Sequence, residues 1–223
     1  VSKKNLGLDL IRIFAAFLVL ICHSGYFSIG ISYAAVNYTG ILAVDFFFVL
    51  SGLLVGKRLI GAVTEAAPGK MLKRFYINRL LRTLPLYYFL LFVNSWIKQE
   101  AIPFSCFLFL QNFQEEALGF MPAAWSLSIE MWFYFIIPPV FLVLFRRFQR
   151  KHSCETAIFF TIGILYLLPM VLRIIHVLVF DPAWDNGVRK QILLRLDSVM
   201  LGVFFAALKI YKPDVYQKIS TSR

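Results

Sequence analysis

The sequence predicts an all-α fold, a bundle of helices that crosses a membrane several times. Of its 223 residues, 60% are hydrophobic and 24 are Phe, whereas a soluble domain is about 45–50% apolar. The chain nevertheless carries a formal net charge of +11. A chain that is both apolar and basic is typical of a membrane protein whose charges lie between its spans. Nucleic acid would also attract this charge, but it does not explain the apolar runs, so no nucleic-acid partner is expected.

Six apolar segments approach the length of about 20 residues that a helix needs to span a bilayer. They cover residues 8–27, 40–56, 83–97, 123–145, 156–180 and 191–210. The third segment is short, because it is expected to begin near Pro85 and to end by Ile97. The apolar stretch 106–110 is too brief to span and is expected to be re-entrant or interfacial.

Lys and Arg lie mostly between alternate segments, and their distribution predicts the orientation. With the N-terminus in the cytoplasm, 18 of the 23 basic residues fall on the cytoplasmic side and three on the opposite side. The sequence therefore predicts a multi-pass protein with a cytoplasmic N-terminus. Its three cysteines have no metal-type spacing, so they are interpreted as small apolar fillers and no metal site is expected.

Ionisable residues within spans cost about 2.5–3.5 kcal/mol each to insert, so they are the first candidates for function. In the first span, Arg12 and His23 are eleven residues apart. This spacing places them on one helix face, about 16 Å apart along the axis. Asp9 precedes Arg12 by three residues and is positioned to pair with it. The alternative interpretation is structural, with Arg12 snorkelling to the interface and His23 ending the helix.

In the second span, Asp45 lies in an otherwise apolar run. It is a candidate to orient an imidazole such as that of His23. Alternatively, it lies at a helix N-terminus, where the helix dipole favours an anion. Ser51 and Gly52 in the same run are interpreted as permitting close helix packing.

The segment 57–82 is predicted to be a loop with seven basic residues and one acidic residue. Within it, Lys70, Arg74 and Arg82 are spaced by multiples of four residues and share a helix face. Arg79 and Arg82 directly precede the third span. These cations either anchor the segment to anionic lipid or clamp phosphate groups, which arginine pairs bind bidentately.

In the fourth span, Ser126, Glu130 and Tyr134 are spaced by four residues and share a helix face. Glu130 lies about a turn and a half inside the span. Whether it has a function or a buried structural partner stays open.

The last two spans hold weaker candidates. Arg173 and His176 lie in the fifth span, and Arg195 and Asp197 lie in the sixth. Arg195 is expected to pair with either Asp197 or Asp45.

Together these segments resemble the integral-membrane acyltransferase family 3, whose members O-acylate bacterial surface glycans. The matching motifs are the Arg12-x10-His23 spacing, DFFFVLSG at 45–52, RLLRTLPLYY at 79–88, WSLSIEMWFY at 125–134 and, more loosely, RLDSVMLG at 195–202. Members typically have about ten helices of membrane-spanning length. The six expected here therefore resemble the N-terminal part of such an enzyme, or a truncated homologue. The resemblance implies one integral-membrane acyltransferase domain over residues 1–223 that is C-terminally incomplete.

The resemblance also implies the substrates and their location. The co-substrate is expected to be acyl-CoA, commonly acetyl-CoA, with no permanently bound cofactor. The acceptor is expected to be a carbohydrate, presented from the opposite side of the bacterial inner membrane. The donor phosphates are expected to bind Arg79 and Arg82 first, and then Arg74 and Lys70.

The same resemblance implies roles within the membrane. His23 is expected to act as general base on the sugar hydroxyl, with an acyl-histidine intermediate as the alternative. Arg12 is expected to position or polarise the donor, and either Glu130 or Asp45 to orient His23. The expected substrate-binding residues are Ser126, Tyr134 and Arg195.

Two other functions stay open at this point. The first is a transporter or channel subunit, in which Arg12, His23, Asp45 and Glu130 form a polar pathway through the membrane. The second is an inactive, truncated fragment with a structural role.

Overall fold

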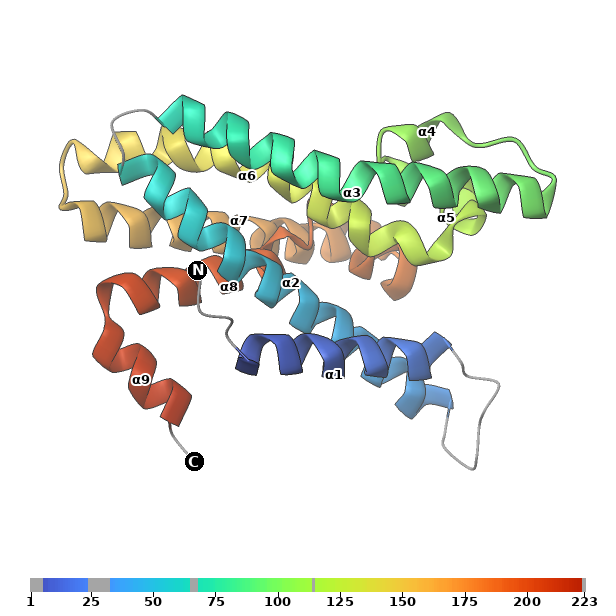
Figure 1. The fold of residues 1–223 in the computed structure, drawn as a ribbon, viewed down its shortest axis with the longest axis horizontal. Helices are drawn as coiled ribbons and strands as arrows, with labels where there is room; N and C mark the ends of the chain where they lie inside the picture. Colours follow the sequence, from blue (N-terminus) through green and yellow to red (C-terminus); the bar gives the residue numbers. More distant parts are fainter. Residues whose placement is uncertain (1–5, 24–32, 65–67, 114, 222–223) are drawn as a thin grey trace.

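The computed structural model describes residues 6–23, 33–64, 68–113 and 115–221, which form helices and no strand (Figure 1). The longest helices are α1 (Leu6–His23), α2 (Tyr33–Thr64), α3 (Pro68–Lys98), α6 (Trp125–Gln149), α7 (Cys154–Phe180) and α8 (Leu196–Tyr211). The short ones are α4 (Phe104–Phe107), η1 (Gln111–Phe113), α5 (Glu115–Phe120), η2 (Pro122–Ala124), η3 (Trp184–Arg189) and α9 (Pro213–Thr221). The predicted all-α class is confirmed.

Four helices in the described residues are long and apolar enough to cross a membrane, so the chain is a multi-pass membrane protein. They cover Tyr38–Thr64, Gly69–Lys98, Pro122–Gln149 and Cys154–Phe180, and they match the second to fifth expected spans. The first and sixth expected segments form α1, of 18 residues, and α8, of 16 residues, which are not among these four. Helix α8 rises about 24 Å, less than a hydrocarbon core of about 30 Å. The end of the first expected segment, 24–27, lies outside the described residues.

Helix α3 differs most from the sequence prediction. It begins at Pro68 and continues through Pro85 to Lys98, so the expected start near Pro85 is wrong. The expected loop at 57–82 is also wrong in its extent, because α2 continues to Thr64 and α3 follows after three undescribed residues. The helix face expected for Lys70, Arg74 and Arg82 is part of α3. Proline is favoured at a first helical position. Within a bilayer, a break at Pro85 would leave backbone groups without water to bind, so the helix continues through it.

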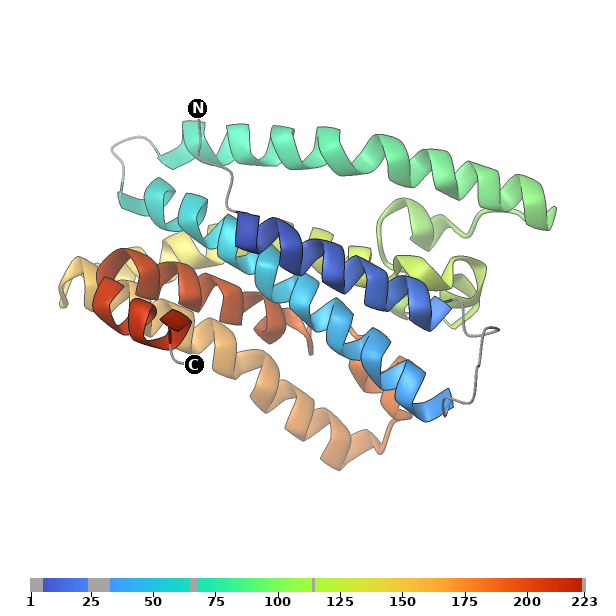
Figure 2. The same ribbon diagram turned by 60° about the horizontal axis from the view of Figure 1, so that its bottom comes forward.

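Helix α2 lies at the centre of the bundle. It packs against α1 on one side and against α8 on the other, and α7 packs against both α6 and α8 (Figures 1 and 2). The α2–α8 crossing is very close: a Cβ atom added to Gly52 would lie 1.9 Å from the Val199 carbonyl oxygen. A Cβ atom added to Gly202 would lie 2.0 Å from the Val49 carbonyl oxygen. The predicted packing role of Gly52 is therefore confirmed, since only glycine allows this backbone contact.

The apolar stretch 106–110 folds back beside the C-terminal half of α3 (Figure 1). The Tyr87 hydroxyl donates to the Cys106 carbonyl oxygen at 2.7 Å, and the Tyr88 hydroxyl donates to that of Phe107 at 3.0 Å. Farther along α3, Lys98 Nζ donates to the Phe120 carbonyl oxygen at 2.9 Å. These bonds fix the segment that leads into α6.

Candidate active site

A cavity of about 460 Å³ lies among α1, α2, α3 and α6. Its polar and ionisable lining comes from all four helices: Arg12 and His23, Ser51, Arg79, Arg82 and Thr83, and Ser126, Glu130 and Tyr134. Seven of the candidates predicted from the sequence therefore meet in one place. Apolar side chains of α1 and α2, among them Val19, Phe47 and Phe48, complete the walls.

Helix α1 contributes the cation and the imidazole. Arg12 and His23 both line the cavity, as their eleven-residue spacing predicts for one helix face. The expected pair with Asp9 is present, with Arg12 Nη1 at 3.1 Å from the Asp9 carboxylate. The His23 side chain is exposed, and no described residue forms a hydrogen bond or ion pair with it.

Glu130 is held by hydroxyl groups from two helices. The hydroxyls of Ser51 on α2 and Tyr134 on α6 both donate to the same oxygen, Oε1, of its carboxylate. The two hydroxyl oxygens lie 2.8 Å apart. The two hydroxyl donors satisfy this oxygen of the carboxylate. Its second oxygen is not engaged by any described residue.

Arg79 lies next to this group but does not pair with a described carboxylate. Its guanidinium carbon is 5.0 Å from the ring centroid of Tyr134 and 5.9 Å from that of Phe75. Cation–π contacts of this kind orient an arginine while leaving its N–H donors free. Its buried Nε atom has no hydrogen-bond partner among the described residues. Arg79 is therefore prepared to bind an anion.

Asp45 and Arg195 are not part of this cavity lining. They form an ion pair that joins α2 to the start of α8, and Arg173 of α7 pairs with Asp197 of α8. The open choice for Arg195 is thus settled in favour of Asp45. The alternative that Asp45 lies at a helix N-terminus is wrong, because α2 begins at Tyr33, more than three turns earlier.

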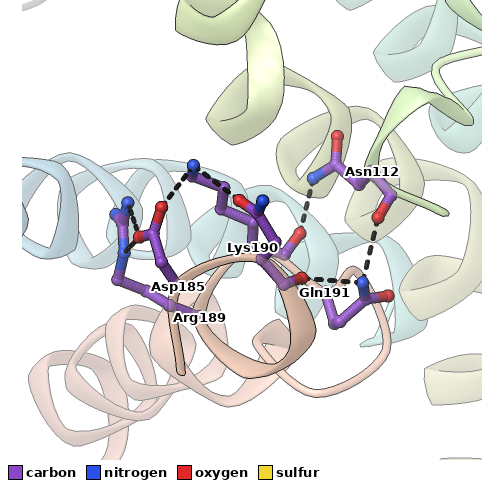
Figure 3. Close-up of polar contacts among 6 residues, drawn as sticks. Asn112, Asp185, Arg189, Lys190 and Gln191 are labelled. Carbon is purple, nitrogen blue, oxygen red and sulfur yellow. Dashed lines mark hydrogen bonds and ion pairs between the residues drawn. The ribbon is translucent and has the colours of Figure 1, made fainter. Parts of the chain in front are cut away.

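The wall formed by the start of α6 is fixed by residues that sequence reasoning missed. The guanidinium of Arg189 lies 4.5 Å from the ring centroid of Trp125, which lines the cavity. Arg189 and Lys190 both bind the carboxylate of Asp185 (Figure 3). Burial tends to raise the pKa of Asp185, but the hydrogen bonds and charges of these two cations outweigh it, so this pKa is lowered.

The side-chain amide of Asn112 connects the segment around Lys190 to the start of α6. Asn112 Nδ2 donates to the carbonyl oxygens of Trp125, at 2.9 Å, and of Lys190, at 2.6 Å. Gln191 Nε2 donates to the Asn112 carbonyl oxygen at 3.0 Å (Figure 3). The contacts of Asn112 with Lys190 and Gln191 join residues 78 and 79 positions apart, so no local pattern in the sequence could have revealed them.

A second cavity, of about 620 Å³, lies between the C-terminal half of α2 and the N-terminal half of α3. Its lining includes Lys70 and Arg74. The four residues predicted to bind the donor are thus divided, with Arg79 and Arg82 in the first cavity and the other two in the second.

Comparison with known proteins identifies the family. Residues 5–221 match the acyltransferase family 3, described as an acyltransferase domain. This chain belongs to that family. It is 27% identical to the O-acetyltransferase OatA of Staphylococcus aureus, in strains NCTC 8325 and COL, over 97% of this chain. The chain spans 37% of the length of these relatives. No solved structure matches it.

Ser51 is a residue of this acyltransferase-family site that was not predicted to belong to it. Its hydroxyl contacts Glu130 from the opposite helix. The available signal was a hydroxyl in the middle of an apolar span, since a buried hydroxyl needs a hydrogen-bond partner. A serine beside a glycine also suits close packing, and for that reason the polar role of Ser51 was missed.

Proposed function

We propose that this protein transfers an acyl group, most simply acetyl, from cytoplasmic acyl-CoA to a hydroxyl group of a surface or exported carbohydrate. The observation that carries the proposal is the convergence of Arg12 and His23, Arg79 and Arg82, and Glu130 on one cavity. The names of the relatives, which are O-acetyltransferases, support the same class of reaction. In this proposal the protein lies in a bacterial inner membrane with a cytoplasmic N-terminus.

The charges of the cavity suit a phosphate-bearing donor. Its lining holds three arginines and one carboxylate, so positive charge is in excess. Arg79 and Arg82 are three residues apart on α3 and are assigned to the diphosphate of the donor. Guanidinium groups bind phosphate bidentately and stay charged when partly buried. Arg12, about 16 Å from His23 along α1, is assigned to position the donor.

His23 is assigned as general base. It accepts the proton of the sugar hydroxyl while the hydroxyl oxygen attacks the thioester carbonyl carbon. A carbon–oxygen bond forms, the carbon–sulfur bond breaks, and the departing thiolate takes the proton from His23. Glu130 lines the same cavity, so it rather than Asp45 is the carboxylate assigned to stabilise the protonated imidazole. Ser126, which also lines the cavity, is assigned to the acceptor.

Substitution of His23 tests the proposal. With His23→Ala we expect acylated surface glycan, measured by mass spectrometry, to fall at least about 100-fold at unchanged protein level, as is typical for loss of a general base. His176→Ala is the matched control, because this histidine lies in α7 and does not line the cavity. Glycan acylation that persisted in His23→Ala would contradict the role of His23. Substrate flux without acyl-CoA would indicate a transporter instead.

A further inference from the structure

The two cavities adjoin each other through a shared wall. Consecutive residues of α2, Leu54 and Val55, line the first and the second cavity respectively. The ring of Phe75 lines the second cavity and lies edge-on to the ring of Tyr134 in the first, with 5.7 Å between their centroids. Phe75 also contacts the guanidinium of Arg79. The contact between the rings of Phe75 and Tyr134 therefore lies between the two spaces.

The second cavity is basic, and its described lining residues include no carboxylate. Arg58 of α2 faces Lys70 and Arg74 of α3 across it. Within the described part of the chain, none of these three cations has an ion pair or a hydrogen bond to its side chain. Its volume, about 620 Å³, lies within the range of about 300–1,000 Å³ that is usual for small-molecule sites. Three unpaired cations around an otherwise largely apolar space indicate an anionic ligand with an apolar part.

We propose that the second cavity binds the 3′-phosphorylated adenosine end of the acyl-CoA donor, with Arg58 as a phosphate-binding residue. This inference rests on the proposed function, which assigns the diphosphate and the thioester to the first cavity. Arg74 in the second cavity and Arg79 in the first are five residues apart, about 7.5 Å along α3, a distance that the ribose between the 3′-phosphate and the diphosphate can bridge. The donor would then pass beside Phe75, which lies between the two groups of cations.

Direct binding tests this assignment without requiring turnover. The protein is purified in nanodiscs of phosphatidylcholine, and the affinities for CoA and for 3′-dephospho-CoA are measured by calorimetry. We expect the wild-type protein to bind CoA at least tenfold more tightly, because a phosphate with charge-assisted hydrogen bonds is lost in the dephosphorylated probe. Arg58→Ala is expected to remove this preference and to leave the affinity for 3′-dephospho-CoA unchanged.

Two neighbouring lysines provide matched controls. Lys57 on α2 and Lys73 on α3 are exposed and do not line either cavity, so Lys57→Ala and Lys73→Ala should keep the tenfold preference for CoA. An equal affinity of the wild-type protein for both probes would overturn the assignment, and so would a preference that survived in Arg58→Ala. Either result would leave the His23 experiment, and with it the proposed function, unaffected.

An anionic lipid headgroup also carries a phosphate that could occupy the second cavity. Changing the lipid composition of the nanodiscs distinguishes this lipid phosphate from the phosphate of CoA. Replacing part of the phosphatidylcholine by phosphatidylglycerol should leave the preference for CoA unchanged if the nucleotide occupies the cavity. If phosphatidylglycerol abolished the preference in the wild-type protein, and had no effect on Arg58→Ala, the cavity would be a lipid site and the proposal would be wrong.

Discussion

At the scale of single residues, the site depends on how one carboxylate is held. Glu130 accepts hydrogen bonds from Ser51 and Tyr134 at the same oxygen. This arrangement stabilises a charge that would otherwise be costly within a span, and it restricts the side chain to one orientation in the cavity. Because Ser51 belongs to α2 and the other two residues belong to α6, the bond also ties the two helices at the level of the site.

The contribution of Ser51 can be measured by removing its hydroxyl. We expect Ser51→Ala to lower acyl transfer about tenfold, because a hydrogen bond to a charged group contributes about 1.5–3 kcal/mol. The thermal midpoint of the protein should also fall, because the same bond ties α2 to α6, and Ser51→Thr should restore most of the activity. Ser128→Ala is the control, since that hydroxyl binds only the Ala124 carbonyl oxygen of its own helix. Equal losses of activity in Ser51→Ala and Ser51→Thr would indicate a packing role only.

At the scale of elements, the α2–α8 crossing sets the position of α2 within the bundle. Glycines on both helices meet there, and each would place an added Cβ atom within 2.0 Å of a carbonyl oxygen of the other helix. Next to this contact, the ion pair between Asp45 and Arg195 joins α2 to the residue that precedes α8. Close backbone packing and interhelical polar contacts are the main attractive forces between helices in lipid. The position of α2 in turn determines where Ser51 meets Glu130.

Gly52→Ala tests this crossing. The new methyl group would overlap the Val199 carbonyl oxygen, so we expect the helices to separate and the protein to lose about 1–3 kcal/mol of stability, as in other overpacked sites. Thermal unfolding in detergent is the measurement. Gly163→Ala in α7 is the control, because no atom lies within 4 Å of its added Cβ. It should leave stability unchanged or raise it slightly. Similar behaviour of the two variants would contradict the close crossing.

At the scale of the whole molecule, the basic residues gather at one end of the bundle. The C-terminal end of α2, the start of α3, the turn between α6 and α7 and the junction of α8 with α9 all lie at the left end in Figure 1. Most of the 23 basic residues lie in or near these segments. Because cytoplasmic loops carry an excess of Lys and Arg, we propose that this end faces the cytoplasm. The second cavity lies toward the same end, which is where a cytoplasmic donor would enter.

Cysteine labelling tests this orientation. In a variant whose three native cysteines are replaced, we expect Lys151→Cys, in the turn between α6 and α7, to react with a membrane-impermeant maleimide only after the cells are opened. Glu100→Cys, which follows α3 at the other end of the bundle, should react in intact cells. Both positions are exposed, so each serves as the control for the other. The reverse pattern of labelling would place the N-terminus outside.

The sequence by itself determined the all-α membrane class, the approximate positions of four spans and the common face of Arg12 and His23. These features follow from hydropathy and helix period, which are local properties of the chain. The seven basic residues at 57–82 could be counted in the sequence, and a shared helix face was expected for Lys70, Arg74 and Arg82. The continuation of α2 to Thr64 and of α3 through Pro85 was missed. Pro85 breaks helices in water, whereas lipid leaves the backbone no better partner than the helix itself.

Only the tertiary structure decided which distant residues meet. The structure placed Glu130 rather than Asp45 in the cavity with His23 and paired Asp45 with Arg195. It also added Ser51 to the site. The basic residues of α3 were divided between two cavities. The physical reason is that helix period determines only which residues share a face. Which face meets which neighbour depends on close packing between helices, here the glycine contact of α2 with α8, and no local pattern in the sequence specifies that contact.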